Sequence, residues 1–251
     1  MTLTNLVSII TPTYNSSLFI REAIESVKRQ TYNSWEMIIV DDKSNDNSVD
    51  IIEKYIGGDD RIKLIKMHSN VGVAAARNAA IEAANGRYIA FLDSDDVWVE
   101  DKLEKQIKFM RSKNAVLTYT AYNKMDVNGL IGSGVVWVKD SLNYNELLYN
   151  TLGCLTVIYD QEALGKMYMT PIGHEDFLLW LQILKKGYTA YGLNEPLAIY
   201  RTNNKSISGN KFKASGFVWN IYRNVEHLPL LTSCICFVKY AFLSYKKYRI
   251  S

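Results

Sequence analysis

Two aspartates that follow a short apolar run have the clearest capacity for chemistry. Asp93 and Asp95 are separated by one residue, directly after residues 88–92. Carboxylate oxygens suit Mg²⁺ or Mn²⁺, which commonly keep coordination positions open for substrate phosphates. A metal bound there neutralises the charge that builds up on a diphosphate leaving group. The alternative interpretation is that Asp95 or Asp96 only caps a helix beginning near Val99.

Polar residues follow each of four short apolar runs in the first hundred residues. They occupy residues 11–15, 41–44, 68–72 and 93–96. In an open parallel sheet, ligands bind beyond the carboxyl ends of the strands. If the four runs are parallel strands, one edge of the sheet gathers an aromatic ring, several carboxylates and the beginning of a helix. This convergence indicates a ligand site more strongly than any single motif does.

Asp41 directly follows a mainly apolar run over residues 36–40. Its carboxylate can accept a hydrogen bond from a nucleobase N–H or a ribose hydroxyl. The alternative is a local turn in which Asp41, Asp42 and Ser44 take part. We favour Asp41 for the ligand and Asp42 or Ser44 for the turn. Tyr14 has two interpretations as well, because its ring can stack on a base or pack inside the protein.

Arg77 lies in the segment 70–78, which opens a helix predicted over residues 72–85. Gly72 allows a close backbone approach, and an arginine on the second turn can reach phosphates. An arginine on a helix is otherwise a solvated charge or a member of a surface ion pair. The small residues 74–76 favour close packing of this helix and a fixed position for Arg77.

Two acids, Glu175 and Asp176, open a predicted helix over residues 175–186. Acids in a first turn interact favourably with the helix dipole, which is a sufficient structural reason for them. The functional interpretation is general base catalysis, in which a carboxylate deprotonates an attacking hydroxyl.

The elements that would position these residues alternate along the first hundred residues. Apolar and β-branched runs predict strands over residues 7–11, 36–40, 62–67 and 88–92. Helical patterns lie between them over residues 18–30, from residue 48, and over residues 72–85, with Ser17 and Ser48 as N-caps and Gly86 as a stop. This alternation implies βαβ units, so the predicted fold is α/β with a mainly parallel, doubly wound sheet flanked by helices.

The second half of the chain is less regular. Its pattern predicts a helix over 102–113, a strand over 115–119, turns at Gly129, Gly132 and Gly134, a helix over 175–186 ended by Gly187, and helical structure over 211–251. The 251 residues, of which 48% are hydrophobic, suffice for one substantial core with a C-terminal extension.

The charge is distributed unevenly along the chain. From Arg201 onward there are nine Lys or Arg against one acid, while the first 200 residues hold twenty against twenty-five. The basic residues after 210 are interleaved with aromatic ones, which favours contact with an anionic membrane surface. The alternative is a packed terminal helix with a solvated basic edge. Nucleic acid is not expected as a partner, because no motif that reads it accompanies the charge.

The remaining composition favours the cytoplasm. The three cysteines make no disulfide framework or zinc site, and the N-terminus lacks the pattern of a signal peptide. The longest apolar stretch, near residues 228–243, is interrupted by Pro229 and Lys239 and is too short to span a bilayer. We therefore expect a cytoplasmic protein that lies peripherally on the inner face of the cell membrane.

Five segments in order resemble glycosyltransferase family 2, over about residues 6–205. They are VSIITPTYN at 7–15, IIVDDKS at 38–44, NVGVAAARN at 70–78, FLDSDD at 91–96 and EDFLLWL at 175–181. The resemblance, which extends to bacterial polysaccharide and O-antigen enzymes, implies the GT-A fold and inverting transfer. It also implies a UDP-sugar or similar donor, Mn²⁺ or Mg²⁺, and a glycan or polyprenyl-diphosphate-linked acceptor.

The resemblance assigns roles by position. It implies metal binding by Asp95 and Asp93, and general base catalysis by Asp176, with Glu175 as the adjacent candidate. Residues expected to contact the donor are Pro12, Tyr14, Asn15, Asp41, Asp42, Asn70, Arg77, Asp93, Ser94 and Arg201. The pair Tyr200 and Arg201, with Ser206 and Ser208, resembles the loop that closes on the donor. Asn203 and Asn204 stand where such enzymes sometimes carry a metal-binding histidine.

The same resemblance divides the chain into a glycosyltransferase domain over 1–210 and a helical tail over 211–251. Within the domain, a nucleotide-binding half covers about 1–98 and an acceptor half about 99–210. One rival is a sugar-1-phosphate nucleotidyltransferase, which needs a glycine-rich loop where residues 12–15 stand. The other is a catalytically inactive membrane-associated binding protein, against which the intact acids argue.

Overall fold

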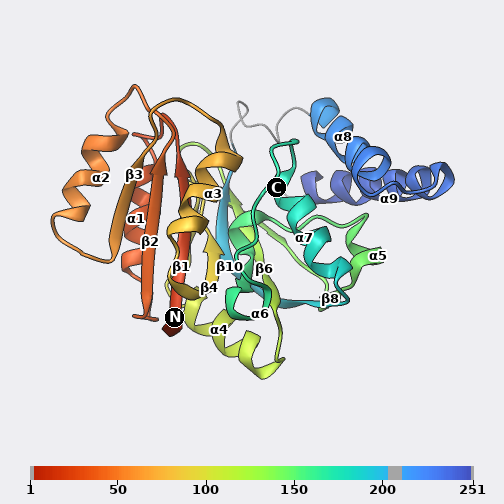
Figure 1. The fold of residues 1–251 in the computed structure, drawn as a ribbon, viewed down its shortest axis with the longest axis horizontal. Helices are drawn as coiled ribbons and strands as arrows, with labels where there is room; N and C mark the ends of the chain where they lie inside the picture. Colours follow the sequence, from red (N-terminus) through yellow and green to blue (C-terminus); the bar gives the residue numbers. More distant parts are fainter. Residues whose placement is uncertain (1–2, 203–210, 250–251) are drawn as a thin grey trace.

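The computed structural model describes residues 3–202 and 211–249, and these form one mixed sheet with helices on both faces (Figure 1). The strands are β1 (Leu3–Thr13), β2 (Trp35–Asp41), β3 (Ile62–Lys66), β4 (Gly86–Phe91), β5 (Val97–Trp98), β6 (Leu117–Met125), β7 (Ile131–Val136), β8 (Ser141–Leu142), β9 (Ile158–Asp160) and β10 (Ala190–Arg201). The predicted strands of the first hundred residues are all confirmed.

The helices are α1 (Ile20–Lys28), α2 (Ser48–Ile56), α3 (Val73–Ala83), α4 (Lys102–Ser112), α5 (Tyr144–Leu147), α6 (Gln161–Leu164), α7 (Glu175–Lys185), α8 (Lys211–Asn220) and α9 (Leu230–Arg249). A 3₁₀ turn, η1 (Cys154–Thr156), and a π-helical turn, η3 (Ile221–Val225), complete the described elements. Figure 1 shows α8 and α9 at the opposite end of the molecule from α2.

The strand order along the sheet is β3-β2-β1-β4-β9-β6-β10-β5, with β7 beside β6 and β8 beside β10. Pairing is parallel among β1 to β4 and between β6 and β10. The short β9 runs antiparallel to both β4 and β6 and joins the two parallel groups. The α/β fold with helices on both faces is therefore confirmed, and antiparallel strands occur in the second half.

Alternate residues of the central strands face opposite sides of the sheet, as in any extended strand. Ile9 of β1 and Ile39 of β2 belong to a buried cluster with residues of α1, α2 and α4. Their neighbours Ile10 and Ile38 belong to a second cluster with residues of α3, α7, η3 and α9. Strands that are apolar on both faces are buried on both faces, which explains the continuous apolar runs.

The predicted helix caps are wrong in detail. Ser17 lies before α1, whose N-cap is Phe19. The Ser17 N–H donates to Asp46 Oδ2 at 3.0 Å. Ser48 is the first residue of α2, and its Oγ accepts the Ser16 N–H at 2.8 Å. Both serines therefore tie the loops after β1 and β2 together. Neither caps a helix.

Gly86 begins β4, whereas the sequence pattern predicted that it would end the preceding helix, which stops at Ala83. Its N–H donates to Ser8 Oγ at 2.8 Å, and an added Cβ would lie 2.7 Å from the Leu6 carbonyl oxygen. The glycine is needed because two strands approach closely there. Gly132 and Gly134 also lie within a strand, β7, so only the turn at Gly129 is confirmed, with φ of +84°. The helix stop at Gly187 is confirmed as well, because α7 ends at Lys185.

Candidate active site

The carboxyl ends of β1, β2 and β4 meet at one edge of the sheet. Thr13 is paired with Asp41, and Ile10 with Phe91, so the polar residues that follow these strands lie together. They border a cavity of about 1190 Å³ that extends to α7 and α9. Its lining includes most of the predicted site residues: Pro12, Tyr14, Asn15, Asp42, Asn70, Arg77, Asp93, Ser94, Asp95, Glu175 and Asp176. Asp41 and Arg201 are the two predicted site residues outside that lining.

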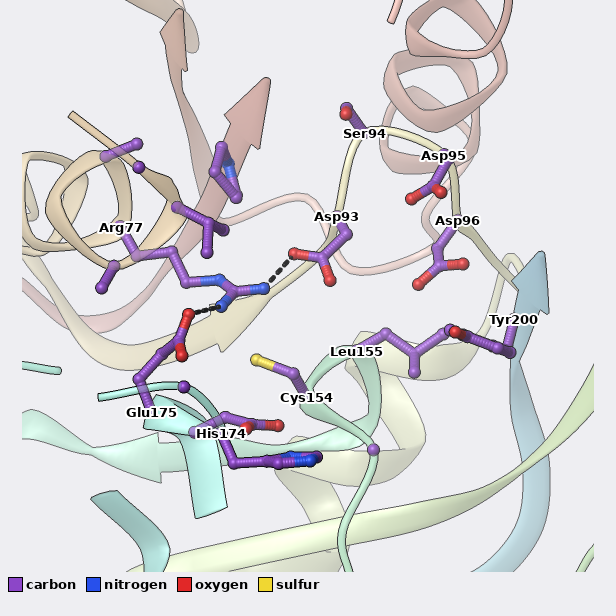
Figure 2. A pocket seen from close by; sticks show the side chains of 18 of the residues that line it. Arg77, Asp93, Ser94, Asp95, Asp96, Cys154, Leu155, His174, Glu175 and Tyr200 are labelled. Atoms are coloured by element: carbon purple, nitrogen blue, oxygen red, sulfur yellow. Dashed lines mark hydrogen bonds and ion pairs between the residues drawn. The ribbon is translucent and has the colours of Figure 1, made fainter. Parts of the chain in front are cut away.

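Arg77 connects an acid that follows β4 with an acid that begins α7 (Figure 2). Its Nη2 donates to Asp93 Oδ1 at 2.6 Å, and its Nη1 lies 3.7 Å from Glu175 Oε1. Burial alone would lower the pKa of Arg77, but the charge of Asp93 and other nearby acidic groups raises it above its ordinary value. The arginine is buried and fixed, as the small residues around it predicted. Its described charged partners are protein carboxylates.

Arg201 holds the turn that carries Asp95 and Asp96. It is 2% exposed, its backbone N–H donates to Asp96 Oδ1 at 2.8 Å, and its Nε donates to the Asp95 carbonyl oxygen at 2.8 Å. Its Nη2 also donates to Glu22 Oε2 at 2.6 Å. The end of β10 therefore fixes the position of the acidic turn. The alternative in which Asp95 or Asp96 caps a helix is wrong, because α4 begins at Lys102 after Asp101.

The acidic turn concentrates negative charge. Burial and the charge of Asp93 raise the pKa of Asp95 to about 6. Burial, followed by the charges of Asp95 and Asp93, raises the pKa of Asp96 well above its ordinary value. A cation near Asp95 relieves this repulsion, so these residues fit a divalent metal. Within residues 3–202 and 211–249, no group of three or more His, Cys, Asp or Glu side chains is arranged to hold a metal ion.

The hydrogen bonds of Asp41 and Asp42 differ from the predicted ones. Asp42 accepts the N–H groups of Val71 and Gly72 at 2.7 and 2.8 Å, so it fixes the beginning of α3. Asp41 Oδ2 accepts the Ser44 N–H at 3.1 Å and thereby makes the local turn. Asp42 as a turn residue was therefore wrong, and Ser44 was right. The other oxygen, Asp41 Oδ1, is buried and has no hydrogen-bond partner among the described residues.

The loop after β1 presents an aromatic ring to the cavity. Tyr14 is 48% exposed and lines the cavity, so the packing interpretation of this ring is wrong. Asn15 has a φ of +49°, and its N–H donates to Ser44 Oγ at 2.9 Å. Asn70 donates through Nδ2 to the Asp42 carbonyl oxygen at 3.1 Å. These bonds tie the loop after β2 to the loop after β1 and to the segment before α3.

The beginning of α7 forms the opposite wall. Glu175 lies against Arg77, whereas Asp176 Oδ1 accepts the Phe177 N–H at 2.8 Å. His174 precedes them with a φ of +52° and also lines the cavity. Both acids lie in the first turn, so the helix-dipole interpretation fits them, and their place in the cavity leaves the general base interpretation equally open.

A further group of cavity residues belongs to none of the sequence motifs. Lys124 comes from the end of β6, and Tyr240, Ser244 and Lys247 come from α9. Lys247 was counted only as part of the basic tail. A tail helix that also forms a wall of the cavity has no local sequence signature, because the contact depends on the tertiary fold. Ser206, Ser208, Asn203 and Asn204 lie outside the described residues.

Comparison with known proteins identifies the family. The model of the family described as Glycosyl transferase family 2 matches residues 8–160. The chain belongs to glycosyltransferase family 2. It is 46% identical over 244 residues to the Putative teichuronic acid biosynthesis glycosyltransferase TuaG of Bacillus subtilis (strain 168), covering 96% of this chain and 97% of the relative. The family confirms a glycosyltransferase and rules out the nucleotidyltransferase rival.

A second relative and two solved structures resemble this family 2 enzyme. The UDP-Glc:alpha-D-GlcNAc-diphosphoundecaprenol beta-1,3-glucosyltransferase WfgD of Escherichia coli is 40% identical over 227 residues, or 90% of this chain and 88% of the relative. S. aureus TarS 1–349 in complex with UDP-GlcNAc has a TM-score of 0.72 at 21% identity, over 96% of this chain and 72% of that one. The mannosyltransferase PcManGT from Pyrobaculum calidifontis, in complex with GDP-Man and Mn²⁺, has a TM-score of 0.69 at 16% identity, over 94% and 69%. Both structures confirm the fold.

Proposed function

We propose that this enzyme transfers a sugar from a UDP-sugar to a hydroxyl of a polyprenyl-diphosphate-linked glycan, with inversion, during synthesis of a cell-surface polysaccharide. One observation carries the proposal: Asp93, Asp95, Arg77 and Asp176 border a single cavity at the carboxyl edge of the sheet. The donor and acceptor named for WfgD, the teichuronic acid biosynthesis named for TuaG, and the UDP-GlcNAc bound to TarS support the choice of donor and acceptor class.

The nucleotide is proposed to bind at the ends of β1 and β2. Tyr14 offers an exposed ring for stacking on the base. Asp41 Oδ1, which is buried without a described partner, is an acceptor suited to a base N–H or a ribose hydroxyl. Asp42 and Asn70 act indirectly by fixing the loops, and Pro12 and Asn15 border the same part of the cavity.

Asp95 and Asp93 are the residues proposed to hold Mn²⁺ or Mg²⁺. Such ions are typically bound through one or two carboxylates together with substrate phosphates, which suits a site with two protein ligands. The ion supplies charge neutralisation to a diphosphate leaving group when it is bound. Ser94 borders the cavity between the two acids. Arg201 serves the site by positioning Asp95 through its backbone carbonyl group.

Asp176 is the proposed general base. The acceptor oxygen forms its bond to the anomeric carbon while the bond from that carbon to the diphosphate oxygen breaks, and Asp176 takes the hydroxyl proton. One displacement inverts the anomeric configuration. Glu175 lies against Arg77, 3.7 Å away, so its negative charge is held by that ion pair. Asp176 has no ion pair within the described part of the chain, which favours it as the base.

The two halves of the domain are proposed to bind different substrates, because they line different walls of the cavity. Residues from the first 98 positions supply the nucleotide and metal wall, and those from 99–210 supply the acceptor wall. The tail over 211–251 joins the acceptor wall, because three residues of α9 line the cavity.

Membrane contact is proposed for the outer face of α9. Within the described residues, no helix has the length and hydropathy needed to cross a bilayer. A row of apolar residues is nevertheless exposed along α9, and it consists of Leu231, Ile235, Val238, Phe242 and Tyr245. We call it the α9 outer row. With the lysines beside it, the row suits the interface of an anionic membrane, which would place the enzyme on the inner face of the cell membrane.

Val238→Asp should weaken binding to anionic vesicles by about tenfold or more, because it replaces an apolar contact with a buried charge. Co-sedimentation of the full chain with phosphatidylglycerol vesicles measures this. Val127→Asp is a matched control, since Val127 is also exposed, at 49%, but lies outside the tail. Equal binding by Val238→Asp and the wild-type protein would remove the outer row from the membrane proposal.

The proposed function is tested directly with UDP-glucose and UDP-N-acetylglucosamine as donors, Mn²⁺, and a short-chain diphosphate-linked GlcNAc as acceptor. We expect metal-stimulated UDP release and a product whose anomeric configuration is opposite to that of the donor, as read by NMR. A retained configuration contradicts the single displacement. Binding of UDP without turnover over a wide donor and acceptor panel favours the inactive binding protein.

A further inference from the structure

Two lysines from distant parts of the chain border the active-site cavity together. Lys124 lies at the end of β6, and Lys247 lies near the end of α9. Lys124 Nζ donates to the Lys247 carbonyl oxygen at 2.6 Å. Lys247 Nζ in turn donates to the Thr151 carbonyl oxygen at 2.6 Å and to its Oγ1 at 3.1 Å. The three residues form a linked group, which we call the lysine cluster.

The lysine cluster concentrates positive charge at the cavity wall. Lys247 is partly buried, and its described hydrogen-bond partners are the neutral oxygens of Thr151. Burial and the charge of Lys124 lower the pKa of Lys247 to about 8, and burial lowers the pKa of Lys124. An ammonium group has three N–H donors, so Lys247 keeps one beyond the two hydrogen bonds described. An anion bound between the two lysines would stabilise both charges.

The lysines of the cluster and the cation beside Asp93 come from different elements of the fold. Arg77, the cation beside Asp93, comes from α3, whereas the lysines come from β6 and α9. One cavity of about 1190 Å³ contains both. It therefore offers two places of different charge character: acids for a metal with the donor diphosphate, and lysines for a second phosphate group.

The cavity face of α9 lies opposite its exposed apolar row. Tyr240, Ser244 and Lys247 line the cavity, and each follows a member of the α9 outer row by two positions. Two residues correspond to about 200° around a helix, so the two sets occupy opposite sides of α9. A helix is about 10 Å across with its side chains, which sets the separation between the outer row and the cavity wall. This distance suits a headgroup that leaves a membrane and enters the cavity.

We propose that Lys124 and Lys247 bind the diphosphate of a lipid-linked acceptor, delivered across α9 from the membrane surface. This inference rests on the proposed function and adds a subsite to it. The lysines recognise the diphosphate through charge-assisted hydrogen bonds, and the sugar beyond the diphosphate then points toward Asp176 and the donor. The tail thus has two linked tasks, because one face of α9 contacts the membrane and the other holds the acceptor headgroup.

Farnesyl diphosphate is the probe that tests this subsite, with binding to the full chain measured by calorimetry in metal-free buffer containing EDTA. Lys247→Gln and Lys124→Gln should each raise its dissociation constant by about ten- to a hundredfold, as expected for lost hydrogen bonds to a charged group. Lys247→Arg should largely restore binding. Lys246→Gln is the matched control, because Lys246 is exposed on the same helix and does not line the cavity.

Three further arms separate the possible explanations. Farnesol, which lacks the diphosphate, should bind far more weakly than farnesyl diphosphate, and equal binding of the two overturns the proposal. The affinity for inorganic diphosphate should depend on the two lysines in the same way as the affinity for farnesyl diphosphate. Affinity for UDP with Mn²⁺, and hydrolysis of UDP-glucose without acceptor, should stay within about twofold of wild type in every variant that keeps its thermal midpoint. A parallel loss of UDP affinity assigns the lysines to the donor and overturns the subsite. If the wild-type protein itself does not hydrolyse UDP-glucose, that result contradicts the proposed function and not the subsite.

Discussion

Asp95→Asn should lower Mn²⁺-stimulated sugar transfer by about two to three orders of magnitude. The substitution keeps the shape of the side chain but removes one of the two carboxylates proposed to hold the metal, so the charge on the leaving diphosphate is no longer balanced. Initial rates of UDP release, measured with and without Mn²⁺, give the effect. Full metal-stimulated activity in this variant would remove Asp95 from the metal site.

The folded state provides an internal control for that variant. Burial and Asp93 raise the pKa of Asp95 to about 6, above its ordinary value of 3.8, so ionised Asp95 opposes folding at neutral pH. A neutral asparagine removes this repulsion, and the thermal midpoint in metal-free buffer should stay the same or rise. A loss of activity therefore cannot be attributed to unfolding. Asp50→Asn, a substitution of an exposed acid in α2, should leave activity unchanged.

The first half of the fold could be predicted because its signals are local. The apolar runs at 7–11 and 36–40 lie within β1 and β2, which are buried on both faces. Helix ends were less predictable, since Ser17 and Ser48 have the side chains of N-caps but bond to the loops instead. Tertiary hydrogen bonds between the loops outweighed the local capping preference.

The second half depends on contacts that no short segment encodes. β10 was not predicted, although it pairs with β6 along most of its length. It contains Gly192 and Pro196, residues that are usually unfavourable in strands, and the register shifts on both sides of Pro196. An added Cβ at Gly192 would collide with the Lys139 carbonyl oxygen, so the glycine allows a close approach that only the folded sheet explains.

The candidate site divides in the same way. Its acids at positions 41, 42, 93 and 95 were predictable, because they lie at the ends of strands, and strands of one parallel sheet end at one edge. The roles of the basic residues depend on distant partners: Arg201 contacts Glu22 and Asp96, and Lys247 contacts Thr151. Their spacing in the sequence carries no information about these pairs. The roles of Arg201 and Lys247 therefore had to be assigned from the structure.

Asp176→Asn should separate binding from chemistry. We expect the rate of transfer to fall by about two to four orders of magnitude, the usual contribution of a general base, while the affinity for UDP with Mn²⁺ stays the same. Asparagine can still accept the Phe177 N–H, which Asp176 Oδ1 accepts at 2.8 Å, so the beginning of α7 should keep its conformation. Titration with UDP and single-turnover transfer give the two quantities.

Glu175→Gln is the variant that tests this assignment against its neighbour. Glu175 Oε1 lies 3.7 Å from Arg77 Nη1, and Arg77 also donates to Asp93. Loss of the Glu175 charge should therefore disturb the proposed metal site and weaken donor binding as well as turnover. Asp176 has no described link to that wall through a hydrogen bond or ion pair. If Asp176→Asn loses UDP binding, or if Glu175→Gln alone loses transfer with normal UDP affinity, the roles of the two acids are exchanged. The distinction is geometric: Glu175 lies within ion-pair distance of Arg77, which makes it a poorer acceptor for a substrate proton, whereas Arg77 acts on Asp176 only through its charge.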